Sequence, residues 1–178
     1  MNSPLRRQFD LAWALADLHL SALSGADHLW EPGPLVWTVH EDSAGRWWPD
    51  FADVEPDPVP VPTIGWLTWH MIFWWSTALA HLEGRPPTPR AEIDWPGPTD
   101  AVRRIRVLHE RWSRLLGTLT DADLLAPATF PWDPDSGRTL ADMVLWLNVE
   151  LTKNAAEIGQ LRLLRAASGE AGRSAEPT

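Results

Sequence analysis

The sequence of 178 residues contains no cysteine and no tyrosine. The lack of cysteine excludes structural disulfides, thiolate metal sites and a cysteine nucleophile, so any thiol chemistry needs a thiol from outside the chain. Basic residues are also scarce, with 15 Lys and Arg against 24 Asp and Glu and a net charge of −9. This balance disfavours nucleic acid and anionic membranes as partners and leaves small molecules and proteins.

The N-terminus has no long apolar run. Gln8, Asp10 and Asp17 interrupt it, so it has the pattern of neither a signal peptide nor a membrane span, and we expect a cytoplasmic protein. The length and the 44% hydrophobic content are typical of one globular domain, which we place at residues 1–167. Residues 168–178, rich in Gly, Ser, Glu and Pro, are expected to form a disordered tail.

Tryptophan is the residue in excess, with 13 copies. Filling the core is the ordinary role of such side chains. Each buried indole N–H needs a hydrogen-bond partner, however, so a core this rich in tryptophan is costly to satisfy unless part of it faces a cavity or a ligand. We therefore expect some of these rings to line a pocket.

Four segments have the periodicity of amphipathic helices, and we expect helices at residues 4–24, 63–83, 99–116 and 139–166. Residues 35–40 and 46–48 predict a small hairpin, and the prolines of residues 49–62 predict an extended crossover. The pattern predicts an all-α fold. We expect an antiparallel four-helix bundle with a long crossover and a small hairpin between the first two helices, and a site between facing helices.

The helix expected at residues 99–116 has a basic face. Its arginines are Arg103, Arg104, Arg106, Arg111 and Arg114. We interpret this face as solvated surface rather than as a binding patch.

The helix expected at residues 63–83 places one histidine among tryptophans. The helical repeat brings five side chains close to one line along its surface: Trp66, His70, Phe73, Thr77 and His81. An imidazole in such a setting either binds a metal ion or a small molecule, or is a buried polar group that lowers stability. Trp66 and Trp74, one turn to either side of His70, are expected to face a cavity, whereas Trp75 is expected to pack elsewhere.

The last helix carries a polar stripe made of Trp146, Glu150, Lys153 and Glu157, with Asn154 beside it. One interpretation is a solvated face on which Glu150 and Glu157 each pair with Lys153. The other is that Glu150 and Asn154 point into the bundle, because apolar residues cover much of this helix. The sequence leaves both interpretations open.

Two segments carry a family resemblance, Gly-Trp-Leu-Thr-Trp-His at residues 65–70 and Glu-Ile-Gly-Gln-Leu-Arg at residues 157–162. With them, nearly the whole chain resembles the DinB/YfiT-like superfamily of small four-helix bundles. This superfamily includes transferases and isomerases that use bacillithiol or mycothiol. Its members typically hold a divalent metal through three histidines, one in the second helix and two at i and i+4 in the fourth.

His70 matches the first histidine of that family site, while Glu150 and Asn154 stand where the other two would be. One alternative is a degraded metal site in which His70, Glu150 and Asn154 hold Zn or Ni. The other is a metal-free cluster in which Glu150 accepts a hydrogen bond from His70, raises its pKa and makes the pair catalytic. The resemblance also implies a low-molecular-weight thiol as cosubstrate.

Three functions follow. The first is a small-molecule-binding protein, with or without thiol-dependent transferase or isomerase activity, whose pocket lies between the second and fourth helices. Its ligand-binding residues are expected to be Trp66, Trp74, Thr77, Trp146, Lys153, Asn154 and Glu157. The second is a non-catalytic binder of an aromatic or hydrophobic compound. The third is a structural homodimer joined through an exposed Trp-rich face.

Overall fold

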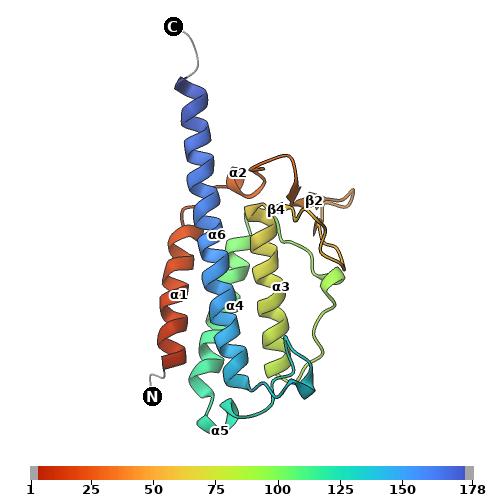
Figure 1. The fold of residues 1–178 in the computed structure, drawn as a ribbon, viewed down its shortest axis with the longest axis vertical. Coiled ribbons are helices and arrows are strands. Elements are labelled where there is room, and N and C mark those ends of the chain that lie inside the picture. The colour runs from red at the N-terminus through yellow and green to blue at the C-terminus, as the bar shows by residue number, and fades with distance from the viewer. Residues whose placement is uncertain (1–3, 175–178) are drawn as a thin grey trace.

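The computed structural model describes residues 4–174 and is mostly helical (Figure 1). The long helices are α1 (Pro4–Leu20), α3 (Ile64–Leu82), α4 (Ala101–Thr118) and α6 (Leu140–Ser174). Short helical turns occupy the connections: α2 (Gly25–His28), η1 (Arg90–Glu92), α5 (Asp121–Leu124) and η2 (Pro134–Ser136). Among residues 4–174, none of the helices combines the length and the apolar surface that a membrane span needs. The predicted all-α class is confirmed.

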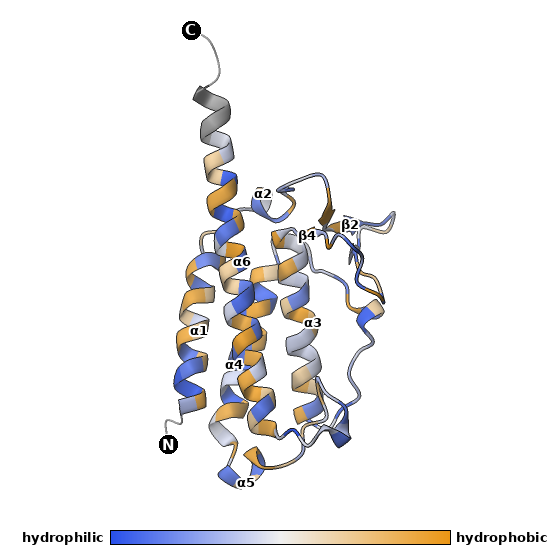
Figure 2. Cartoon of the chain, in the orientation of Figure 1, coloured by the Kyte–Doolittle hydropathy of each residue, from blue (hydrophilic) through white to orange (hydrophobic). Residues whose placement is uncertain are grey.

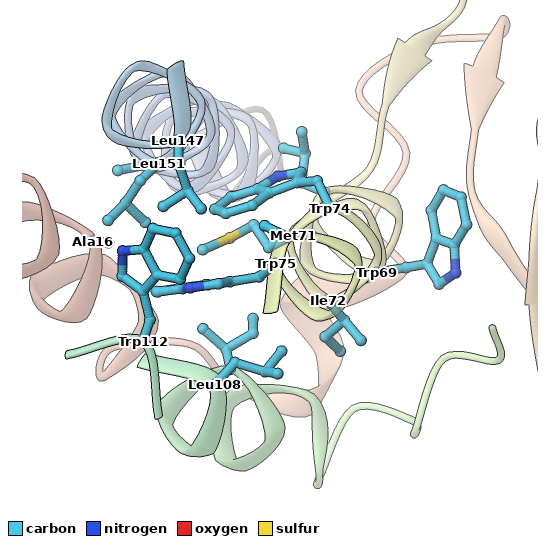
Figure 3. Close-up of a cluster of buried hydrophobic side chains, with 14 of the residues drawn as sticks. Ala16, Trp69, Met71, Ile72, Trp74, Trp75, Leu108, Trp112, Leu147 and Leu151 are labelled. Atoms are coloured by element: carbon cyan, nitrogen blue, oxygen red, sulfur yellow. The ribbon is translucent and has the colours of Figure 1, made fainter. Parts of the chain in front are cut away.

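Helix α3 is the central helix of the fold. Thirteen of its nineteen residues are buried, so it is apolar on nearly every side, as expected for a helix that other elements surround. Along the other long helices, hydrophobic and hydrophilic residues alternate (Figure 2). Figure 3 shows the side chains that close around Met71 and Trp75 of α3; they are Ala16 of α1, Leu108 and Trp112 of α4, and Leu147 and Leu151 of α6.

Helices α1 and α6 lie side by side and run parallel. The Asn148 amide of α6 donates to the carbonyl of Leu5, near the start of α1, at 3.2 Å. Further along both helices, an Arg162 nitrogen lies 3.2 Å from Nδ1 of His19. The direction of α4 is opposite, because Arg6 bonds to Ser113 whereas Asp17, later in α1, bonds to Arg106, earlier in α4.

Helices α3 and α4 also run parallel (Figure 1). Residues 83–100 return the chain along the outside of α3, and two indoles hold this connector: Trp95 Nε1 donates to Thr68 Oγ1 at 3.0 Å and Trp69 Nε1 donates to the Ile93 carbonyl at 2.8 Å. The expected antiparallel arrangement is therefore only half right. Hydrophobic periodicity specifies which face of a helix is buried, whereas the connectors decide in which direction it runs.

The segment between α1 and α3 contains two small sheets. Strands β2 (Val39–Glu41) and β3 (Trp47–Pro49) form the predicted antiparallel hairpin. Strands β1 (Val36–Trp37) and β4 (Val61–Pro62) pair in parallel, which the proline-rich pattern did not indicate. Because the Thr63 N–H donates to the Trp37 carbonyl at 2.8 Å, this second pair fixes the start of α3, which Thr63 caps.

Three boundaries differ from the sequence predictions. Helix α1 ends at Leu20 rather than at residue 24, and α4 begins at Ala101 rather than at residue 99. Helix α6 continues to Ser174, so residues 168–174, expected in the disordered tail, are helical. This stretch contains Ala, Glu and Arg and no proline, so nothing in it stops a helix sharply. The rest of the expected tail, residues 175–178, lies outside the described residues.

Two glycines of α6 provide a test of the α1–α6 packing. A Cβ at Gly159 would lie 2.6 Å from His19 Nε2, whereas a Cβ at Gly169 would meet nothing within 4 Å. We expect Gly159→Ala to lower the free energy of unfolding by about 1–3 kcal/mol because the ring must shift. Gly169→Ala should raise it by roughly 0.5–1 kcal/mol through helix propensity. Urea unfolding measures both, and equal effects would contradict the close approach at Gly159.

Candidate functional site

The candidate site lies where α3 faces α6, and a stack of aromatic rings forms one part of it. The His70 ring stacks on Trp66 with centroids 5.0 Å apart and planes 14° apart. Trp66 also stacks with Trp37 at 5.2 Å, and its indole N–H donates to the Asp50 carbonyl at 2.6 Å. The segment between α1 and α3 therefore holds Trp66 in place, and Trp66 in turn supports His70.

Helix α6 contributes Asn154 to the site, and this side chain is fully buried. Its Oδ1 accepts a hydrogen bond from Trp74 Nε1 at 3.1 Å, and its Nδ2 donates to Glu157 Oε2 at 2.9 Å. Of the two interpretations that the sequence left open, the one in which Asn154 points into the bundle therefore holds for this residue. Both polar ends of its side chain are already engaged.

Glu150 pairs with Lys153 rather than with His70. The Lys153 ammonium lies 2.7 Å from Glu150 Oε2, and the two side chains are 46% and 15% exposed. Of the two pairs expected along the polar stripe, only this one forms, because Glu157 accepts from Asn154 instead. A partner one turn away on the same helix reaches Glu150 without crossing the interface.

The His70 pKa is lowered to about 4 from an ordinary value of 6.5. Burial of the ring is the largest cause, and the nearby Lys153 ammonium adds to it; Glu150 and the Asn154 side chain oppose the shift. The expected increase in pKa is therefore wrong, and His70 is neutral near pH 7. Its Nδ1 is buried without a hydrogen-bond partner among the described residues.

The other expected residues take different positions. Thr77 lies on the same side of α3 as His70, and its Oγ1 is likewise buried without a partner in the described part of the chain. Trp146 packs edge-on against Trp74 at 6.3 Å. Trp75 packs as expected away from this face, where its ring meets Phe9 at 6.1 Å.

Sequence reasoning missed the aromatic residues of the loop before α6. Phe130 packs edge-on against Trp146 at 5.3 Å and stacks on His81 at 5.4 Å. Trp132 approaches Trp146 at 6.4 Å. The signal for both was their occurrence in a short loop that is otherwise polar, next to a helix with its own tryptophan.

The comparisons with known proteins bear on this fold. The family model for the DinB superfamily matches residues 8–158. The chain belongs to the DinB superfamily. Comparisons with curated proteins and with solved structures gave no significant match. For this DinB-superfamily protein, the function must therefore be argued from its own residues.

The residues at the expected metal site do not fit a metal. Asn154 Oδ1 already accepts the Trp74 N–H, and Glu150 is bonded to the Lys153 ammonium. A divalent cation there would lie beside the Lys153 ammonium, and the amide and carboxylate that should bind it are already bonded to other groups. Within residues 4–174, no group of three or more His, Cys, Asp or Glu side chains is arranged to hold an ion.

We expect the purified DinB-superfamily protein to carry well under one equivalent of Zn or Ni, and His70→Ala to leave that content unchanged. A double variant, Glu150→His with Asn154→His, adds two imidazoles beside His70 and should raise the Zn content toward one equivalent. Elemental analysis measures both. Near-stoichiometric metal in the parent, lost in His70→Ala, would contradict the poor fit.

The low pKa of His70 predicts a specific pH dependence of stability. The unfolded chain binds this proton near pH 6.5 and the folded chain near pH 4. The contribution of His70 is therefore complete above pH 6.5 and falls, by as much as about 3 kcal/mol, as the pH drops toward 4. The stability of a His70→Phe variant should decline less over this window, as measured by urea unfolding.

Variants of Lys153 and Glu150, the two charged neighbours of His70, test the causes of its low pKa. Lys153→Met should raise the His70 pKa because it removes a nearby cation, and Glu150→Gln should lower it. An NMR titration of the ring protons reports both shifts. A His70 that titrates above pH 6.5 in the parent protein would contradict the origin of the shift in burial.

Proposed function

We propose that this DinB-superfamily protein binds a small aromatic molecule at the α3–α6 face around His70, without a metal. The observation that carries the proposal is the neutral His70 ring, stacked on Trp66, with a buried Nδ1 that has no partner among residues 4–174. An unpaired buried polar atom costs about 1–3 kcal/mol. A ligand with a hydroxyl group would remove that cost.

The surroundings favour an aromatic ligand. Trp66 is half-buried and Trp146 likewise, so each ring keeps part of its surface accessible beside the buried Trp74. The Glu150–Lys153 pair adds polar groups next to these rings. Small-molecule sites typically combine such apolar walls with a few placed polar groups.

The burial of the tryptophans argues against the structural alternative. All thirteen lie in the described part of the chain, where each is buried or half-buried. The exposed large apolar residues are instead leucines, valines and one phenylalanine, among them Leu11 and Leu18 of α1. The hypothesis of a homodimer joined through an exposed Trp-rich face is therefore disfavoured, because none of these tryptophans is exposed.

Thiol-dependent transfer or isomerisation is the second candidate, and Lys153 is the observation that favours it. An ammonium beside the site would stabilise the thiolate of a thiol supplied from outside. His70 is poorly suited as the base, because its pKa of about 4 lies far below the value near 8.5 of a free thiol. We therefore place binding before catalysis.

The proposal can be tested with phenol and toluene as probes. Both rings can pack against the indoles of this face, but only the phenol hydroxyl can bond to His70. We expect phenol to bind about tenfold more tightly, since a buried hydrogen bond and the relief of an unpaired nitrogen together contribute roughly 1–2 kcal/mol. Shifts of the indole N–H signals in NMR spectra measure both affinities and locate the probe.

His70→Phe is the matched variant because it keeps an aromatic ring on Trp66 and removes the nitrogen. It should bind phenol and toluene equally. Substitution of the exposed His40, which lies in the hairpin, serves as the control and should leave the preference intact. A phenol preference that persists in His70→Phe, or indole shifts confined to residues away from Trp66 and Trp74, would overturn the proposal.

A further inference from the structure

A second candidate site lies on the other side of α3, between this helix and α4. Two cavities of about 260 and 170 Å³ adjoin there and share Ser76, Thr88 and Arg104. Residues of the connector 83–100, Thr88 among them, line both cavities. The arrangement is separate from the α3–α6 face that carries His70.

The larger cavity is strongly basic. Arg85, Arg104 and Arg111 all line it. One carboxylate, Glu83, pairs with two of them: its Oε2 accepts from Arg111 Nη2 at 2.6 Å and also from Arg85. Three guanidinium groups and one carboxylate leave two positive charges in a chain whose net charge is −9.

Arg104 is the uncommitted member of this group. Within residues 4–174 its guanidinium donates no hydrogen bond and forms no ion pair, unlike the guanidinium groups of Arg103 and Arg106, which pair with Asp100 and Asp17. Arg104 is exposed, as expected for the basic face of this helix, and its side chain also lines both cavities.

The two cavities differ in charge, since the larger one is basic and the smaller one is lined by acidic residues. Ala80, Val107 and Leu108 give the larger cavity an apolar wall, which strengthens electrostatic interactions beside it. Glu92 and Asp94 line only the smaller cavity, where they would repel an anion. The Thr88 hydroxyl has no hydrogen bond among the described residues and lies at the junction.

We propose that the larger cavity binds the phosphate group of a phosphorylated small molecule. Guanidinium groups recognise phosphate through paired N–H donors, and two net positive charges match a dianion. Glu83 holds Arg85 and Arg111 in position before the ligand arrives, so less side-chain freedom is lost on binding. Arg104 supplies the third guanidinium, and the hydroxyls of Ser76 and Thr88 can donate to the remaining oxygens.

Calorimetric titration of the full chain with inorganic phosphate and with glycerol 3-phosphate, in 150 mM NaCl, tests this site. Arg104→Ala should weaken both affinities at least tenfold, since hydrogen bonds to charged groups are of that strength. Arg104 is exposed and unbonded, so this variant should fold normally. Arg114→Ala, which removes an exposed arginine of α4 that does not line the cavity, is the matched control and should bind like the parent.

Glu83→Gln is a variant of opposite sign, because it removes the carboxylate charge that partly neutralises Arg85 and Arg111 but keeps a side-chain oxygen that can accept from them. It should tighten phosphate binding several-fold and keeps the proposal testable even if Arg104→Ala affects folding. Absence of phosphate binding by the parent would overturn the proposal, as would equal losses in Arg104→Ala and Arg114→Ala. Binding of succinate as tight as that of glycerol 3-phosphate would overturn the assignment to phosphate.

Discussion

Three of the four indole N–H groups of α3 are the constraint on which the rest of the structure depends. Trp66, Trp69 and Trp74 each donate to a different segment, namely to the Asp50 carbonyl, the Ile93 carbonyl and Asn154 Oδ1. A buried N–H without a partner costs about 1–3 kcal/mol. The segment before α3, the connector after it and helix α6 must therefore all meet α3 at a fixed register, which general hydrophobic packing would not impose.

The chemistry of the α3–α6 face follows from these bonds. Because Trp74 engages Asn154 Oδ1, the amide is not available as a metal ligand, and because Lys153 engages Glu150, the carboxylate is not available to charge His70. The imidazole is left largely buried beside a cation, and both conditions favour its neutral form. Glu150 and Asn154 thus surround His70 with groups that are bonded elsewhere and leave its imidazole neutral.

Local patterns in the sequence predict the helices and the alignment of Trp66 with His70, since both depend on spacing within one helix. They do not predict the partner of Glu150. Lys153 on the same helix and His70 across the interface were both within reach, and burial, which a single sequence does not show, decides between them. The parallel course of α3 and α4 was equally hidden, because it depends on the connector that Trp95 anchors to Thr68.

A central helix that is buried on nearly every side also explains how one small domain can carry two unlike surfaces. The side of α3 toward α6 presents a neutral imidazole among indoles, while the side toward α4 lies beneath three arginines. Met71 and Trp75 fill the core with apolar atoms between the packed helices (Figure 3). Because apolar atoms lie between them, the two sides take their polar groups from different neighbours of α3, helix α6 on one side and α4 with the connector on the other.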